Sequence, residues 1–303
     1  MGILKDIHTA WARFRDARER NPQHTMFTHR LPRFPLPERR PLPDALPDVA
    51  ILTPCRDAAR DLSTYFGLVD ALDYPKHRLH LRLLEGDSVD DTFDRAKRML
   101  AARDGTYGST GLLKLDLNMD LRRDGRTAKN LQRRRRSGIA ACRNRLLHAG
   151  METPARFFLF LDVDMARIPP NALRRALEWD APILAANCLT HDGGKIFDRN
   201  LFFYTRPVSD RSAKRFVRDG IYQPPTGFFR HYPPPDSPHE IEPLHSVGGT
   251  FLLIRRDVIE AGTDFPEEPY QLHIETEGFA LKAADRGFGA FMLPGLIVRH
   301  GPN

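Results

Sequence analysis

Two carboxylates that follow an apolar run are the residues of this chain best suited to chemistry. Five consecutive apolar residues, Phe157–Leu161, are followed by Asp162 and Asp164. The run predicts a buried parallel strand, and open α/β sheets bind ligands beyond the carboxyl ends of their strands. Two aspartates at that edge could hold one divalent cation and one sugar or nucleotide hydroxyl. The alternative is that one of them caps the following turn.

A histidine after the final predicted strand could complete a metal site. His300 follows the apolar stretch 290–298, and it would reach Asp162 and Asp164 if the two strands were near neighbours. Carboxylate oxygens joined by an imidazole suit Mn²⁺, with Mg²⁺ as the alternative cation. We therefore predict a metal site formed by these three side chains. The alternative for His300 is a surface position near a free terminus.

A strongly basic segment precedes the apolar run. Residues 122–145 contain ten Lys or Arg and one acidic residue, whereas the whole chain has a formal net charge of +7. Charge this local favours a diphosphate pocket, an acidic acceptor or an anionic membrane surface over a broad polyanion-binding face. Four consecutive residues spread around the whole axis of a helix. We therefore expect one or two of Arg133–Arg136 to bind a ligand and the others to form a solvated face.

Polar residues at other element ends could contact a ligand. Arg143 offers a planar fork and Asn144 an amide pair, which suit a phosphate or a base. Asp87 follows the second predicted strand and could bind a base edge or cap a turn.

Two short motifs in the last third of the chain each allow two interpretations. Gly248 and Gly249 open a strand, so a sugar could approach the backbone closely, although a tight turn or bulge explains them equally well. Glu275 and Glu277 open a predicted helix. Their carboxylates could accept hydrogen bonds from sugar hydroxyls or act as bases, or they could complement the helix dipole.

An alternation of strands and helices must position these residues. The predicted strands are Val49–Thr53, Leu79–Leu84, Leu112–Leu117, Phe157–Leu161, Ile183–Ala186, Phe251–Ile254 and Ala290–Val298. The predicted helices are Leu62–Leu72, Asp90–Arg103, Ala128–His148, Asn171–Trp179, one from about Asp257, and Glu275–Arg286. This order is typical of an α/β domain with a mostly parallel sheet flanked by helices.

Two proline-rich stretches interrupt the pattern. Residues 31–47 contain six prolines and predict an extended arm. Residues 207–245 contain eight prolines, seven of them between Pro224 and Pro243, and the aromatic residues in this segment predict a lid that faces an acceptor. We expect an N-terminal amphipathic helix with its proline-rich arm over residues 1–48, and a single domain over residues 49–303.

The N-terminal twenty residues combine an apolar stripe with basic neighbours. The stripe consists of Ile3, Leu4, Ile7, Trp11 and Phe14. It predicts an amphipathic helix, either docked on the domain or frayed, or else resting on a bilayer. Three cysteines without paired spacing indicate a reducing compartment, and no apolar stretch is long enough for a membrane span. We expect a cytoplasmic protein, with residues 1–20 as the candidate for peripheral contact at the inner face of a membrane.

Six stretches, taken in order, carry a resemblance to a known family. They are Ile-Leu-Thr-Pro at 51–54, Arg-Arg-Arg-Ser at 134–137, Cys-Arg-Asn-Arg-Leu-Leu at 142–147, Phe-Leu-Asp-Val-Asp at 160–164, Val-Gly-Gly-Thr-Phe-Leu-Leu at 247–253 and Ile-Glu-Thr-Glu-Gly-Phe-Ala at 274–280. From about Val49 to His300 the chain resembles the fungal Golgi mannan-polymerase α-mannosyltransferases, glycosyltransferase family 62. Members of that family carry an N-terminal membrane anchor, a feature that this sequence does not show.

The resemblance implies a GT-A fold, a Mn²⁺-dependent site and GDP-mannose as the donor, with retention of the anomeric configuration. It places Asp162, Asp164 and His300 at the metal, and Glu275 and Glu277 in the sugar pocket. We predict nucleotide contacts from Thr53, Pro54, Asp87, Arg136, Arg143, Asn144, Gly248 and Gly249.

The sequence therefore predicts a retaining glycosyltransferase that moves a hexose, mannose by resemblance, to a glycan or glycolipid acceptor. Asp162, Asp164, Glu275 and Glu277 are the predicted catalytic residues. One alternative is a module that binds polyanions or nucleic acid through residues 122–145, although no nucleic-acid motif is present and we expect no nucleic-acid partner. Another is a metal-dependent hydrolase of sugar nucleotides.

Overall fold

A central β-sheet organises the computed structural model, which describes residues 34–117 and 132–302. Within those residues the sheet has nine strands in the order β11-β13-β6-β12-β4-β1-β2-β3, with β5 paired to β13. The strands are β1 (Val49–Cys55), β2 (Leu79–Glu85), β3 (Ser109–Lys114), β4 (Phe157–Leu161), β5 (Met165–Arg167), β6 (Ile183–Leu189), β11 (Glu242–Leu244), β12 (Phe251–Arg255) and β13 (Ala290–His300).

Most of these strands run in one direction. Strand β1 pairs in parallel with β2 and β4, β2 with β3, and β6 with β13. Strand β12 lies antiparallel between β4 and β6, so the carboxyl ends of β1, β2, β4, β6 and β13 all face the same edge. The predicted α/β class with a mostly parallel sheet is confirmed.

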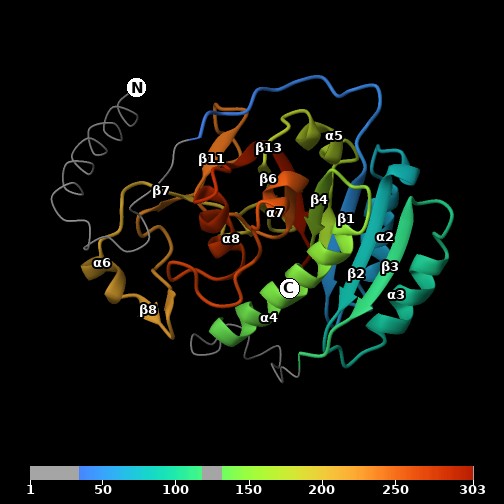
Figure 1. The fold of residues 1–303 in the computed structure, drawn as a ribbon, viewed down its shortest axis with the longest axis horizontal. Helices are drawn as coiled ribbons and strands as arrows, with labels where there is room; N and C mark the ends of the chain where they lie inside the picture. The colour runs from blue at the N-terminus through green and yellow to red at the C-terminus, as the bar shows by residue number, and fades with distance from the viewer. Residues whose placement is uncertain (1–33, 118–131, 303) are drawn as a thin grey trace.

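Helices cover both faces of this sheet (Figure 1). They are α2 (Leu62–Asp70), α3 (Thr92–Ala101), α4 (Gln132–Met151), α5 (Ala172–Leu177), α7 (Arg256–Glu260) and α8 (Glu275–Ala284), with a 3₁₀ turn, η2, at Lys76–Arg78. Alternate residues of β1 enter two apolar cores, one shared with α2, α3 and α5 and the other with α4, α7 and α8. Because each large buried side chain stabilises the fold by about 1.5–3 kcal/mol, these two cores hold the carboxyl edge rigidly.

An inserted lobe, residues 202–232, gives regular structure to much of the segment 207–245 that was expected to be irregular, and the lid role of that segment stays a prediction. The lobe contains β7 (Phe203–Tyr204), α6 (Asp210–Lys214), β8 (Val217–Arg218), β9 (Ile221–Tyr222) and β10 (Arg230–His231). Its side chains form a third, separate apolar core. Figure 1 shows the lobe beside α8, on the opposite side of the molecule from β3 and α3.

Several boundaries differ from those predicted. Strand β3 begins at Ser109 rather than Leu112, because its pairing with β2 sets the register from residue 109 onward. Strands β6 and β13 extend beyond their predicted ends, to Leu189 and His300. Helix α4 continues to Met151, and its predicted first residues, 128–131, lie outside the described residues, as does the predicted helix over residues 1–20. No helix in the described ranges combines the length and the apolar character needed to cross a bilayer.

Candidate active site

The three predicted metal ligands converge at the carboxyl edge of the sheet. Asp162 directly follows β4, and His300 is the last residue of β13. The short strand β5 pairs antiparallel with β13, and Gly301 N donates to the carbonyl oxygen of Asp164 at 2.7 Å. One ligand atom from each of Asp162, Asp164 and His300 lies within 4.8 Å of the others. The chain path therefore brings together the side chains that the sequence selected.

The imidazole of His300 is held in one orientation. Its Nδ1 donates to the carbonyl oxygen of Gly301 at 2.9 Å, and the ring stacks on Phe197 with centroids 3.6 Å apart. This leaves Nε2 facing Asp164 Oδ1 at 3.0 Å. Burial lowers the pKa of His300, but the contacts with Asp164 outweigh it and raise the pKa overall. An imidazole fixed through Nδ1 presents Nε2 as a ligand, which is the usual arrangement at protein metal sites.

Negative charge is concentrated at Asp162. Burial is the largest cause that raises the pKa of its carboxyl to about 7, and the carboxylates of Asp164 and Asp198 also raise it. The guanidinium of Arg143 acts in the opposite direction and lowers this pKa. Clustered carboxylates are stabilised in ionised form by a cation. An oxygen, oxygen and nitrogen donor set fits a hard or borderline divalent ion such as Mn²⁺.

Arg143 joins the metal cluster to helix α8. Its Nε donates to Glu275 Oε1 at 3.1 Å, and its Nη2 lies 3.7 Å from Asp162 Oδ1. The guanidinium also lies over the ring of Phe160, 5.0 Å from the centroid. Its Nη1 is buried and has no hydrogen-bond partner. A buried donor of this kind is costly without an acceptor, and it fits an anionic oxygen of a ligand.

The two glycines before β12 make room for side chains of the protein itself. A Cβ atom at Gly249 would lie 2.0 Å from Arg143 Nη2, and one at Gly248 would lie 1.7 Å from Asp198 Oδ2. Asp198 accepts hydrogen bonds from Gly249 N at 3.0 Å and from the hydroxyl of Thr250 at 3.2 Å. The side chains of Arg143 and Asp198 occupy the space beside the backbone of these glycines, where a sugar was predicted to approach. The predicted contact of both glycines with a nucleotide stays a prediction.

Asp198 is a site residue that sequence reasoning missed. It lies in the loop after β6, and its carboxylate also accepts from Asn200 N at 3.2 Å in a local turn. Burial raises the pKa of Asp198. The only sequence signal was an aspartate in a turn-forming stretch, and many surface loops contain one.

The two predicted glutamates at the start of α8 differ in their surroundings. Glu275, which holds Arg143, has φ of +59°, a conformation that non-glycine residues rarely adopt and that is common at functional sites. Glu277 is nearly fully buried, 3.6 Å from Arg136 Nη1 and 3.5 Å from Arg230 Nη2. Burial by itself raises the pKa of Glu277, but the two guanidiniums outweigh it and hold the pKa below its usual value.

The remaining predicted residues lie near the same edge and have protein partners. The hydroxyls of Thr53 and Tyr65 are 2.6 Å apart. Asp87 accepts from Leu117 N at 2.9 Å. Asn144 clamps the backbone of Phe265, accepting from its N at 2.8 Å and donating to its O at 2.9 Å. Pro54 lies on β1, paired to Leu84. Their contacts with a nucleotide stay predictions.

Solved structures share this architecture. GalNAc-T7 with UDP, GalNAc and Mn²⁺ is 12% identical with a TM-score of 0.52, over 86% of this chain and 45% of that chain. TarS 1-349 of S. aureus in complex with UDP-GlcNAc is 13% identical with a TM-score of 0.51, over 84% of this chain and 59% of that chain. The chain thus spans about half the length of these proteins, and the expected GT-A fold is confirmed.

Sequence relatives cover most of the chain. The mannan polymerase complex subunit mnn9 of Schizosaccharomyces pombe is 27% identical over 271 residues, 84% of this chain and 80% of the relative. The mannan polymerase II complex ANP1 subunit of Saccharomyces cerevisiae is 22% identical over 282 residues, 83% of this chain and 54% of the relative. The model of the Anp1 family matches residues 43–269. The resemblance inferred from the six motifs is confirmed, and the chain belongs to the Anp1 family.

Proposed function

We propose that this protein is a metal-dependent retaining glycosyltransferase that moves mannose from GDP-mannose to a glycan or glycolipid acceptor. The observation that carries the proposal is the convergence of Asp162, Asp164 and His300 beside the unpartnered Nη1 of Arg143, at the ligand-binding edge of a GT-A fold. Relatives named as mannan polymerase subunits support mannose as the sugar, and the motif resemblance supports guanosine diphosphate as the leaving group.

Asp162, Asp164 and His300 would hold the cation, Mn²⁺ or Mg²⁺. When bound, it supplies positive charge that stabilises the departing diphosphate. Arg143 adds a second positive charge, because Nη1 is free to donate to a phosphate oxygen while Nε stays on Glu275. Preorganised donors of this kind stabilise developing charge in the transition state.

Retention makes a strong general base unnecessary. The acceptor hydroxyl attacks the anomeric carbon from the face that the diphosphate leaves, the bond to phosphate oxygen breaks, and that oxygen can take the hydroxyl proton. Glu275 has a second carboxylate oxygen that can accept from a sugar hydroxyl. Glu277 stays ionised between Arg136 and Arg230, and we assign it a positioning role within the sugar pocket.

A transfer assay tests this proposal. The purified full chain is incubated with GDP-mannose and a mannotriose acceptor, with Mn²⁺, with Mg²⁺ and with EDTA. We expect an elongated product that depends on the cation and disappears in EDTA. Free mannose released without acceptor would instead indicate a hydrolase. Transfer from UDP-sugars in preference to GDP-mannose would overturn the donor assignment and keep the transferase assignment.

Membrane contact through residues 1–20 is a separate proposal, together with a cytoplasmic location. Basic residues near an anionic surface contribute about 1 kcal/mol each, and the predicted apolar stripe adds to this. Co-sedimentation with phosphatidylserine vesicles, using the full chain and a truncated variant that begins at Leu31, tests it. Equal pelleting of the two proteins would exclude residues 1–20 as the contact.

A further inference from the structure

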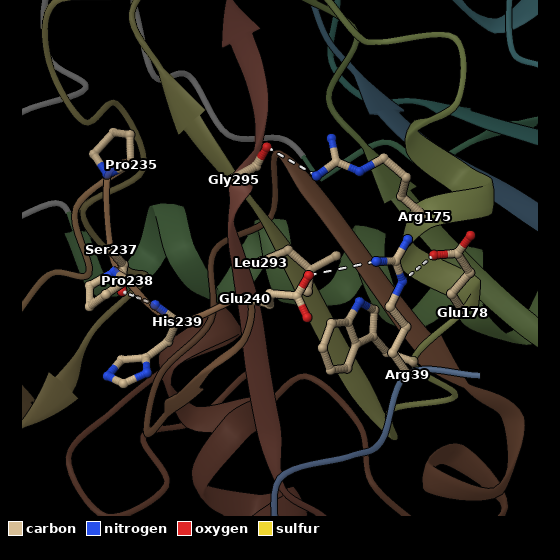
Figure 2. Close-up of a pocket in the computed structure, with 11 residues that line it drawn as sticks. Arg39, Arg175, Glu178, Pro235, Ser237, Pro238, His239, Glu240, Leu293 and Gly295 are labelled. Atoms are coloured by element: carbon tan, nitrogen blue, oxygen red, sulfur yellow. Dashed lines mark hydrogen bonds and ion pairs between the residues drawn. The ribbon is translucent and has the colours of Figure 1, made fainter. Parts of the chain in front are cut away.

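A cavity away from the metal cluster lies where the two proline-rich stretches meet. Its volume is about 280 Å³, and it is bounded by Arg39 of the arm, the end of α5, residues 235–240 and strand β13 (Figure 2). The arm is fastened to α5 by a hydrogen bond from Arg40 N to the carbonyl oxygen of Glu178. The cavity is thus built from segments that are distant in sequence, and none of its lining residues has a role in the proposed chemistry.

The lining combines apolar surfaces with balanced charge. Apolar surface comes chiefly from Pro235 and Pro238, and Trp179 and Leu293, which are 8% and 3% exposed, contribute the edges that the core leaves uncovered. Two arginines and two glutamates balance in charge: Arg39 lies between Glu178 and Glu240, and Arg175 points toward Gly295. Because these charges cancel, the cavity does not favour a phosphate or another ion. It suits a neutral ligand with apolar ring faces and several hydroxyls. The apolar ring faces can pack on aromatic and proline surfaces, and the hydroxyls can bond to the carboxylates and guanidiniums.

The polar groups are already arranged and retain bonding capacity. Arg39 Nε donates to Glu178 Oε2 at 2.7 Å, Arg39 Nη1 lies 3.6 Å from Glu240 Oε1, and Arg175 Nη2 donates to the carbonyl oxygen of Gly295 at 3.2 Å. The side chain of Glu240 is 72% exposed. A carboxylate accepts about four hydrogen bonds and a guanidinium donates five, so hydroxyls can bind without breaking these pairs. Groups held in place before binding lose little entropy.

Strand β13 connects this cavity to the metal cluster. A bulge between Leu293 and Ile297 interrupts its pairing with β6, and bulges are frequent beside functional sites. Gly295, at the cavity, precedes His300 by five residues, which span at most about 17 Å of strand. An oligosaccharide of several units is long enough to reach from one place to the other.

We infer that this cavity, lined by Arg39, Trp179, Glu240 and His239, is a binding site for a neutral oligosaccharide, the part of the acceptor chain remote from the reacting end. The inference rests on the proposed function, because it names how a glycan acceptor would be held. It predicts that longer acceptors are used better than short ones.

Tryptophan fluorescence measures binding directly. The chain has two tryptophans, Trp11 and Trp179, so the full chain carrying Trp11→Phe reports on the cavity alone. It is titrated with α-linked mannopentaose, with no donor and with EDTA present. We expect a saturable change in emission. The variant Glu240→Ala with His239→Ala should bind about tenfold more weakly, the loss of one charged hydrogen bond.

A matched control and a second readout complete the test. Glu38→Ala removes a glutamate of the arm that is 82% exposed and outside the cavity, and this variant should bind like the parent. In the transfer assay, the ratio of kcat/KM for mannopentaose to that for methyl α-mannoside should fall about tenfold in the double variant but not in Glu38→Ala. No emission change, or equal affinity in all three proteins, overturns the inference. Binding without any transfer would keep this site and overturn the proposed function instead.

Discussion

Two charged clusters near the start of helix α8 differ in how their charges are balanced. In the first, Asp162 and Asp164 are 26% and 44% exposed and lie beside His300, with more carboxylate than cation. In the second, Glu277 is 4% exposed between Arg136 and Arg230. The first, the open cluster, has more carboxylate than cation and is accessible to solvent. The second, the closed cluster, is buried and has more cation than carboxylate.

This difference in charge balance distinguishes residues suited to chemistry from residues that hold elements of the fold in position. Clustered carboxylates repel one another, and a fold retains such a cluster where a cation or a substrate balances it. A buried carboxylate held by two guanidiniums is already satisfied, and its main role is to join elements, here the inserted lobe to α8 and α4. The sequence alone does not separate the two clusters, because sequence-predicted catalytic residues occur in both.

The largest expected effect is loss of transfer when the open cluster is broken. Asp164→Ala should reduce kcat/KM for transfer at least a thousandfold, about 4 kcal/mol of transition-state stabilisation. The melting temperature should stay equal or rise, because one of two repelling carboxylates is removed. Steady-state kinetics with Mn²⁺ and thermal unfolding measure the two quantities. A variant that unfolds without losing activity per folded molecule would place Asp164 with the structural cluster.

The closed cluster should show the opposite behaviour. Glu277→Ala leaves Arg230 buried under the rings of Phe202 and Tyr204 without its carboxylate. Breaking a buried pair in this way costs about 3–5 kcal/mol of the free energy of unfolding. Urea denaturation measures it. As a control, Glu277→Leu with Arg230→Met should recover most of the loss; failure to recover would show that the pair does more than join elements.

Gly249→Ala should disturb the open cluster through Arg143. The added methyl would lie 2.0 Å from Arg143 Nη2, so the guanidinium must move away from Asp162. We expect transfer to fall about a hundredfold, roughly 2.7 kcal/mol. The loss of folding stability should be smaller, about 1–2 kcal/mol, as for other overpacked sites. Equal losses of both would mean that Arg143 acts only in packing.

Acid should weaken the closed cluster first. Burial lowers the pKa of His273 from 6.5 to about 4, although the nearby carboxylate of Glu277 raises it. The neutral imidazole accepts a hydrogen bond from the hydroxyl of Tyr204 at 2.8 Å, and its Nδ1 donates to the carbonyl oxygen of Gln271. Between pH 6.5 and 4 the unfolded chain binds one more proton than the folded chain. The stabilisation is therefore complete above pH 6.5 and is lost as the pH falls.

Urea denaturation at pH 7 and pH 5 measures this dependence. His273 should account for about 2 kcal/mol of the loss between the two values. His273→Gln should show a loss smaller by that amount, although His245, whose pKa burial also lowers to about 4, still contributes in both proteins. Identical pH profiles for the two proteins would contradict the assignment.

Sequence patterns predicted the open cluster better than the closed one. The apolar strand β4 and the residues after it are contiguous, so their order along the chain already places Asp162 and Asp164 at an edge. Helix periodicity likewise gave α4 and α8 closely. Pairing between distant segments was invisible: Arg230 meets Glu277, and Asp198 meets Gly249, although no period or motif relates them. Strand β3 was misplaced for the same reason, because its register depends on β2.

The smallest expected effect lies in the basic run at the start of α4, where four arginines look alike in sequence. Arg136 pairs with buried Glu277, whereas Arg133 pairs with Glu268 and Asp219, which are 77% and 50% exposed. Exposed pairs contribute little because water and salt screen them. Arg133→Ala should therefore shift the melting temperature by no more than about 1 °C and leave transfer unchanged. Arg136→Ala should lower the melting temperature by several degrees, since Glu277 loses one of its two partners. A comparable loss for both variants would mean that the run acts as one basic surface rather than through the single residue that reaches the closed cluster.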